Sequence, residues 1–414
     1  MSDIRRLNTL SRVGKLGKTF YEELRQAPTR GRKVVWVGGY TTPVLLFRAM
    51  DMDYMYTEAY SATLTATHQE KPSLALSEAE GYSADYCSYG RICTGSLLMS
   101  EEEKAKSDPM YLVPDPDCVF VVNNGCPILV YWFDYIRKHF NAPSFALDIP
   151  FVWDRTEEQD VIRETEIQFK EAVVFLEDIA KRKLDWERLQ EIVAEVKRTM
   201  TIRMEAQDLA GSAIPSPATF FDWSIALGAP NHSIGTPLCT EIYEQLRDEL
   251  KERIARGEGA LVDEKCRLFW YGVQLWPHIG TISKMLAGMG ANVLASFYTH
   301  RTFCHRPDLL NPEKPLESLA ANTILWANYN FEQVAEDLID MCRKYSIDGL
   351  VCHYARTCPL FSRYYFEMAD AVSQALGIPS IHFEGDLADS EFFSPNRFET
   401  QIQTLVETIL SKKH

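Results

Sequence analysis

Several features are scarce or missing in this sequence, and each absence narrows what the chain can do. No apolar run reaches the about 18 residues that a membrane-spanning helix needs, and residues 1–20 lack a hydrophobic signal core. We therefore expect a cytoplasmic protein without a membrane partner. Lys and Arg number 43 against 58 Asp and Glu, which gives a net charge of −15. Because nucleic acids attract positive charge, we expect no nucleic-acid partner.

The ten cysteines include no C-x-x-C pair, the compact motif that often announces an iron–sulfur cluster. Disulfides are rare in the cytosol, so we expect most of these cysteines to be small buried side chains and a few to be ligands. Cys87, Cys126 and Cys358 are the candidates, because each lies in a polar loop. The alternative, that each is a packed free thiol, stays open at this point.

Short apolar runs alternate with amphipathic stretches at both ends of the chain, which is typical of strand–helix–strand units and parallel sheets. Helical periodicity dominates the middle. The expected strands are 33–37, 53–60, 117–122, 144–149, 266–271, 291–298, 349–352 and 379–383, and the expected middle helices are 158–182, 185–208 and 237–256. Residues 81–95 are expected to be rich in turns.

This pattern predicts an α/β fold with two Rossmann-like, doubly wound parallel-sheet lobes and a helical connecting subdomain. The expected divisions are an N-terminal helix and linker (1–30), a first lobe (31–156), a helical connector (157–260) and a second lobe (261–414). The length and the 46% hydrophobic content suffice for several separate cores.

Candidate chemistry lies where predicted strands end, because ligands collect beyond the carboxyl ends of strands in open α/β sheets. Cys126 and Cys358 each follow a strand and precede a predicted helix, so the positive helix end would face each thiolate. Glu58 lies near the end of predicted strand 53–60, either as a catalytic acid/base or as a solvated carboxylate. His353 could relay a proton or be a satisfied loop histidine. Structural roles are expected for His278, His300, Glu384 and Asp386.

Six segments, in order, resemble the 2-hydroxyacyl-CoA dehydratase / benzoyl-CoA reductase family, and in particular its larger, α-type subunits. The resemblance covers about residues 30–410. The segments are YSADYCSYGR, VVNNGCPILVYWFD, IPSPATFFDW, WPHIGTISKMLAGMGANVLASFY, CHYARTCPLFS and FEGDLADSEFFSPNRFETQIQ. A YTEA segment that contains Glu58 is similar to the family's YPEN.

The resemblance implies a [4Fe–4S] cluster in the cleft between two lobes, held by Cys87, Cys126 and Cys358, with the fourth iron left open. It also implies a heterodimer with a related smaller β-type subunit, an ATP-dependent iron–sulfur activator protein and an acyl-CoA substrate. The implied reaction removes water from an (R)-2-hydroxyacyl-CoA to give an enoyl-CoA, through a ketyl radical that forms after one-electron activation. Glu58 would be the catalytic acid/base.

Two departures from the family pattern leave alternatives open. Pro359 follows the third cysteine, where the family often has Lys, and the turn Gly38-Gly39-Tyr40 lacks a Ser found in α-type dehydratases. A benzoyl-CoA-reductase-like subunit that reduces an aromatic ring is therefore one alternative. The others are an electron-relay partner subunit without substrate contact and a cluster-free binding protein with two lobes.

Overall fold

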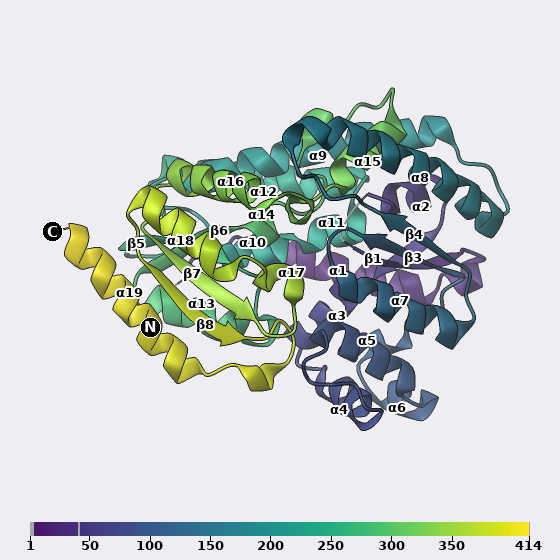
Figure 1. Ribbon diagram of the computed structural model, residues 1–414, viewed down its shortest axis with the longest axis horizontal. Helices are drawn as coiled ribbons and strands as arrows, with labels where there is room; N and C mark the ends of the chain where they lie inside the picture. The colour runs from purple at the N-terminus through teal and green to yellow at the C-terminus, as the bar shows by residue number, and fades with distance from the viewer. Residues whose placement is uncertain (1–3, 40–41, 414) are drawn as a thin grey trace.

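The computed structural model describes residues 4–39 and 42–413, and in this part of the chain the strands form two separate parallel sheets (Figure 1). The first sheet contains β1 (Val34–Gly38), β2 (Asp53–Tyr56), β3 (Cys118–Asn123) and β4 (Ser144–Asp148), in the order β2-β1-β3-β4. The second contains β5 (Cys266–Tyr271), β6 (Ala291–Ser296), β7 (Gly349–Ala355) and β8 (Ser380–Gly385), in the order β6-β5-β7-β8. The predicted α/β class with two parallel sheets is confirmed, and the two sheets share one strand order.

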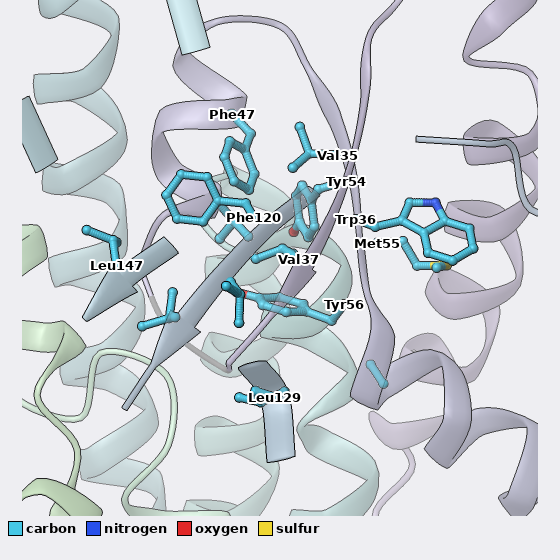
Figure 2. Close-up of a cluster of buried hydrophobic side chains, with 14 of the residues drawn as sticks. Val35, Trp36, Val37, Phe47, Tyr54, Met55, Tyr56, Phe120, Leu129 and Leu147 are labelled. Atoms are coloured by element: carbon cyan, nitrogen blue, oxygen red, sulfur yellow. The ribbon is translucent and has the colours of Figure 1, made fainter. Parts of the chain in front are cut away.

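Buried side chains cover both faces of the first sheet (Figure 2). Val35 lies with Phe47 and Phe120 on one face, whereas Trp36 and Met55 lie on the other. The rings of Phe47 and Phe120 pack edge to face, with 5.4 Å between their centroids. A strand that is buried on both faces has a continuous apolar sequence, and for this reason the run KVVWV predicts a strand.

Helices surround the sheets and connect them. Their bounds are α1 (Leu10–Arg25), α2 (Val44–Ala49), α3 (Thr57–Ala66), α4 (Lys71–Ala79), α5 (Ser88–Leu98), α6 (Glu101–Lys106), α7 (Pro127–Phe140), α8 (Glu158–Ala180), α9 (Trp186–Ser212), α10 (Phe220–Ala226), α11 (Gly228–Ser233), α12 (Pro237–Ala255), α13 (Ile279–Gly288), α14 (Phe297–His300), α15 (Pro315–Thr323), α16 (Phe331–Lys344), α17 (Pro359–Ser362), α18 (Tyr365–Leu376) and α19 (Pro395–Lys413). The three predicted middle helices correspond to α8, α9 and α12. Among the described residues, no helix combines the length and apolarity needed to cross a membrane.

The chain changes from strand to helix directly after β2, whereas the sequence predicted a strand to residue 60. That prediction is wrong beyond Tyr56, because α3 begins at Thr57. Nearly every side chain of α3 is buried, so the helix has no polar face and its sequence lacks the period that marks a surface helix. Glu58 therefore lies in the first turn of a helix, not at the end of a strand.

Helix α5 replaces part of the stretch predicted to be rich in turns. The prediction is wrong from Ser88 onward, because α5 runs from there to Leu98. Its glycines suggested turns, but Gly95 serves close packing: a Cβ at this position would lie 1.8 Å from the carbonyl oxygen of Ser73 on α4. A glycine inside a helix thus sets how near α4 and α5 approach each other.

Buried arginines hold the helical middle against the second sheet. Arg267 on β5 pairs with Glu264, with 2.8 Å between Nη1 and Oε1. The same guanidinium donates to the carbonyl oxygens of Ala213 (2.9 Å), Tyr345 (3.0 Å) and Gly211. One side chain therefore joins the end of α9 to β5 and to the end of α16. The domain limits proposed from the sequence stay predictions.

Candidate functional site

Each of the three candidate thiols sits directly before the first turn of a helix. Cys126 follows β3 and caps α7, and Cys358 follows β7 and caps α17. Because β3 and β7 hold the same place in their sheets, these two cysteines occupy equivalent positions, each followed by a proline at the first helical position. Cys87 is the N-cap of α5. The positive ends of three helices therefore face the thiols, one more than the sequence predicted.

The three sulfur atoms lie in a buried environment that opposes their ionisation. Burial raises the pKa of Cys126 to about 11 and that of Cys358 to about 12, and it raises the pKa of Cys87 well above its ordinary value. Charges on Cys358 and Cys126 raise the pKa of Cys87 further. In the opposite direction, backbone N–H groups lower the pKa of each thiol: that of Gly90 acts on Cys87, that of Leu129 on Cys126 and that of Phe361 on Cys358. Three neighbouring thiolates in this environment would need a compensating cation, such as a metal centre bound there would supply.

The loop before α5 is tied to the loop before α17. Arg356 pairs with Asp85, with 2.9 Å between Nη2 and Oδ1. Nearby, the backbone N–H of Ser88 donates to the Thr357 hydroxyl (3.2 Å), and that hydroxyl donates to Asp386 (2.5 Å). The residues on either side of Cys87 therefore contact those that precede Cys358, although the two loops are distant in sequence.

The loop before Cys126 lies against the second lobe as well. Gly125 has a φ of +96°, a conformation that favours glycine. A Cβ at this position would lie 3.2 Å from the carbonyl oxygen of Ala327 and 3.5 Å from Leu360. Leu360 follows Cys358 by two residues. Close approach at Gly125 thus places the start of α7 next to the start of α17 (Figure 1).

A cavity of about 100 Å³ lies where these loops meet, and all four predicted site residues line it: Glu58, Cys87, Cys126 and Cys358. Glu58 is 7% exposed, so the alternative that it is a solvated carboxylate is wrong. Its Oε1 accepts from the backbone N–H of Gly39 (2.7 Å) and its Oε2 from the Thr57 hydroxyl (3.1 Å). Burial raises the pKa of this carboxyl despite these two donors, a shift of the kind found in catalytic acids and bases.

A model of the family described as "2-hydroxyglutaryl-CoA dehydratase, D-component" matches residues 40–409. The chain belongs to this family. It is 28% identical to the lactoyl-CoA dehydratase subunit alpha of Anaerotignum propionicum, over 93% of each chain. It is also 28% identical to the (R)-2-hydroxyisocaproyl-CoA dehydratase alpha subunit of Clostridioides difficile, over 95% of this chain and 94% of the relative. Identity to a benzoyl-CoA reductase subunit of Thauera aromatica is 26%, over 95% of this chain and 92% of that one. The resemblance noted in the sequence is confirmed.

The cysteines that do not line the cavity are buried in this member of the D-component family. Cys118 and Cys352 lie inside β3 and β7, and Cys93 lies inside α5. Burial raises the pKa of Cys93 and Cys118 to about 12 each. These three thiols are part of the hydrophobic cores, as expected for Cys118 and Cys352.

The other candidates make contacts of a structural kind. His353 lies inside β7 rather than in a loop, and its Nδ1 lies 2.7 Å from the carbonyl oxygen of Val273. His278 contacts the carbonyl oxygen of Ser390 (3.1 Å). His300 contacts the Thr299 hydroxyl (2.8 Å). The remaining two are acidic: Asp386 accepts from the backbone N–H groups of Ala388 and Asp389 (both 2.9 Å), and exposed Glu384 pairs with Arg356 (3.4 Å).

Sequence reasoning missed Tyr298 as a site residue of this D-component chain. It was expected in strand 291–298, but β6 ends at Ser296 and Tyr298 lies in α14, where it lines the cavity. Strands β2 and β6 hold the same place in their sheets. Tyr298 is the second residue after β6, as Glu58 is the second residue after β2, so the shared strand order could have indicated that Tyr298 is a site residue. In the serine-free turn, Tyr40 lies outside the described residues, as does the following Thr41.

Proposed function

We propose that this chain is the [4Fe–4S] subunit of a radical 2-hydroxyacyl-CoA dehydratase. It would remove water from an (R)-2-hydroxyacyl-CoA to give an enoyl-CoA, through a ketyl radical that forms after ATP-driven one-electron activation. The observation that carries the proposal is the arrangement of three thiols, each at a helix N-terminus, around one cavity that Glu58 also lines. The names of the relatives, four of which are 2-hydroxyacyl-CoA dehydratase alpha subunits with a defined acyl group, support the reaction class.

Three thiols around one cavity are donors of the kind that hold an iron–sulfur cluster. Among the described residues, no three His, Cys, Asp or Glu side chains converge closely enough to hold one metal ion. A cuboidal cluster presents its irons at separate corners, so Cys87, Cys126 and Cys358 can hold it without converging on one point. When bound, such a cluster supplies one strongly reducing electron and a Lewis-acidic iron with an open position.

The chain's own residues would then exclude water and move a proton. Apolar side chains make up most of the cavity wall, among them Trp132, Trp326 and Phe361, and a dry site protects a radical from solvent. Glu58 is held by Gly39 and Thr57 at the start of α3, where it can accept the proton that leaves the β-carbon and return it to the departing hydroxyl. The proton transfer releases water, and the added electron is given back when the enoyl thioester forms, so the net reaction is loss of water alone.

A partner chain and an activator are part of this proposal. The relatives' names describe each of them as one subunit of an enzyme, which supports a heterodimer with a related smaller subunit. The electron would come from a separate ATP-dependent iron–sulfur protein.

We infer in addition that each sheet with its helices is a Rossmann-like, doubly wound lobe. Both sheets have the strand order 2-1-3-4, so the direction in which strands are added to the sheet reverses after the second strand, as in doubly wound folds.

A second candidate function is reduction of an aromatic acyl-CoA ring. The aromatic side chains of the cavity wall suit a planar ring, and 26% identity to a benzoyl-CoA reductase subunit extends over nearly the whole chain. Both functions need the same cluster ligands. They differ in the product formed from the thioester.

Anaerobic purification with iron, sulfide and activity analysis tests the proposal. We expect about four irons per chain and, with activator, ATP and a partner subunit present, release of an enoyl-CoA from a 2-hydroxyacyl-CoA. Cys126→Ser should lose the cluster, whereas Cys118→Ser, on the strand that leads to Cys126, should keep it. Iron-free protein would contradict the cluster, and reduction of benzoyl-CoA without dehydration would favour the second function.

A further inference from the structure

We infer that this site accepts thioesters whose acyl group is uncharged and apolar, and that it rejects acyl groups that end in a second carboxylate. The inference rests on the proposed function and specifies its substrate class. It depends on the charges that surround two neighbouring cavities. The first is the cavity that the three thiols line.

No Lys, Arg or His side chain is among the described residues that line this first cavity. Of these lining residues, Glu58 is the one ionisable side chain apart from the thiols and tyrosines, and as a carboxyl group it offers no positive charge to a carboxylate of the substrate. Most of the wall is apolar or aromatic: Ile128, Leu129, Trp132, Val273, Leu325, Trp326, Ala327, Leu360, Phe361 and Leu387. An acyl chain placed there removes apolar surface from water, which favours a neutral chain.

A second, larger pocket of about 610 Å³ shares Tyr298 and Thr302 with the first cavity. A hydrogen bond crosses the partition between them, from the indole N–H of Trp276, which lines the larger pocket, to the hydroxyl of Tyr89, which lines the smaller. The two spaces are therefore neighbours. We place the carbonyl of a bound thioester near the thiols and the rest of the ligand on the side of the larger pocket, towards Tyr298 and Thr302.

The cationic side chains of the larger pocket lie on α1 and are not buried. Lys18 is exposed, and Arg25 is partly exposed and donates to the carbonyl oxygen of Pro109 (3.3 Å). His232 lies deeper, but burial lowers its pKa to about 4, so its ring is neutral at pH 7. Positive charge is thus available to the polar end of a ligand near the surface and not to the end of an acyl chain inside.

Two buried arginines near the two spaces are already engaged, whereas a third, Arg363, is partly buried and its Nε has no hydrogen-bond partner among the described residues. Arg203 donates to the carbonyl oxygens of Thr299 and Thr302 (2.8 Å to Thr302). Arg91 pairs with Asp389 (2.7 Å). Arg363 lies over the ring of Trp326, with its guanidinium carbon 5.8 Å from the ring centroid, and it does not line the cavity. A carboxylate in the cavity would therefore be buried without a cation, which is strongly unfavourable.

Binding of stable, unreactive thioesters to the anaerobically purified protein tests the inference without requiring turnover. Hexanoyl-CoA, glutaryl-CoA and free CoA would be compared by calorimetry. We expect glutaryl-CoA to bind about 100-fold more weakly than hexanoyl-CoA, because its terminal carboxylate loses hydration without gaining a partner. Affinities of the two thioesters within about threefold of each other, or hexanoyl-CoA no tighter than CoA, would overturn the inference.

A cation placed in the cavity wall provides the matched test. Ile128→Lys on α7 introduces an ammonium group at the lining, and Val130→Lys introduces one on the same helix at a position that is 45% exposed and outside the lining. Ile128→Lys should raise the affinity for glutaryl-CoA relative to hexanoyl-CoA by about tenfold, and Val130→Lys should leave the ratio unchanged. An unchanged ratio in a folded Ile128→Lys protein would place the acyl group elsewhere. If the protein binds hexanoyl-CoA in preference to glutaryl-CoA but shows no dehydration activity, the proposed reaction would be contradicted and the inference about the acyl group would stand.

Discussion

Two cysteines of α5 differ in their relation to the cavity although they lie on one helix. Cys87 caps the helix and lines the cavity, whereas Cys93 is buried in the hydrophobic core. We predict that Cys87→Ala loses most of the cluster iron, because one of three thiolates is missing. Cys93→Ala should keep about four irons per chain, since it removes a buried thiol that contacts no metal. Iron analysis of both anaerobic proteins provides the measurement.

The paired design separates ligand loss from general damage. Circular dichroism of the two variants would show whether α5 remains folded. If Cys93→Ala loses as much iron as Cys87→Ala, the loss follows disturbance of α5 rather than removal of a ligand. Retention of iron in Cys87→Ala would make the ligand assignment wrong.

Glu58 is the side chain that we expect to transfer the proton. Glu58→Gln keeps an oxygen that can accept from the N–H of Gly39, so we predict that the cluster and the fold are retained. The turnover number should fall by about 100-fold or more, because general acid–base catalysis contributes that much or more to such steps. The measurement is kcat for dehydration beside iron content. An unchanged kcat with a full cluster would assign Glu58 a structural role.

At the scale of elements, the contact between α4 and α5 positions Cys87, the first of the three proposed cluster ligands. We predict that Gly95→Ala lowers the free energy of unfolding by about 3 kcal/mol, because its Cβ would overlap the backbone of Ser73 and the helices must separate. Gly14→Ala is the control, since a Cβ on this α1 glycine meets nothing within 4 Å. That change should raise stability by about 0.5–1 kcal/mol. Urea unfolding of both proteins measures the difference.

The iron content of Gly95→Ala extends the prediction to the site. Movement of α5 away from α4 would displace Cys87 from the other two thiols, so the variant should also bind iron less completely. Wild-type stability in Gly95→Ala would show that the two helices adjust without cost. Unaltered iron content in a destabilised variant would show that the position of Cys87 depends on Asp85 and Ser88 instead.

The elements that could be predicted from the sequence are those whose local pattern agrees with their environment. Strands β1 and β3 are buried on both faces and have continuous apolar runs, and α7 begins at a proline after a polar turn. Helix α3 could not be recognised, because burial on nearly all sides removes its amphipathic period. The glycines of α5 suggested turns because sequence alone does not show that α4 passes close to Gly95.

The site was predictable in its parts but not in its assembly. Cys126 and Cys358 could be placed because each follows a strand, and parallel strands that hold equivalent positions end at the same edge of their sheets. Cys87 follows no strand, and its approach to the other thiols depends on contacts such as that between Asp85 and Arg356, 271 residues apart. Contacts between residues so far apart in sequence follow from the tertiary fold, so no local sequence pattern predicts them.

At the scale of the whole molecule, the site exists only while the two lobes remain together. Cys87 and Cys126 belong to the first lobe and Cys358 to the second, and buried arginines such as Arg91 cross between them. Arg91 is fully buried and joins α5 to Asp389, which follows β8. Burying a charge is unfavourable unless a partner is present, and separation of the lobes would leave Arg91 with Glu78 alone and Asp389 without this guanidinium. The contacts that hold the thiols together are therefore also contacts that hold the lobes together.

Buried neutral histidines should make the stability of the assembled protein sensitive to acid. Burial lowers the pKa of His353 from 6.5 to about 4, and it lowers the pKa of His300 well below 6.5. Between these values the unfolded chain binds more protons than the folded one, so stability falls as pH decreases from 6.5 towards 4. For His353 the loss is about 3 kcal/mol, since each pKa unit corresponds to about 1.4 kcal/mol.

Other buried groups titrate in the same range, so the prediction is tested as a difference. Burial raises the pKa of Asp222, which acts in the opposite direction over part of this interval. We predict that wild-type protein loses about 3 kcal/mol relative to His353→Gln between pH 7 and pH 4, because the glutamine cannot take up the proton. Urea unfolding at several pH values gives both curves, and His139→Gln on the exposed side of α7 controls for removal of an imidazole. Parallel curves for wild type and His353→Gln would mean that protonation of His353 does not cause the loss of stability at low pH. Other groups would then be responsible for it.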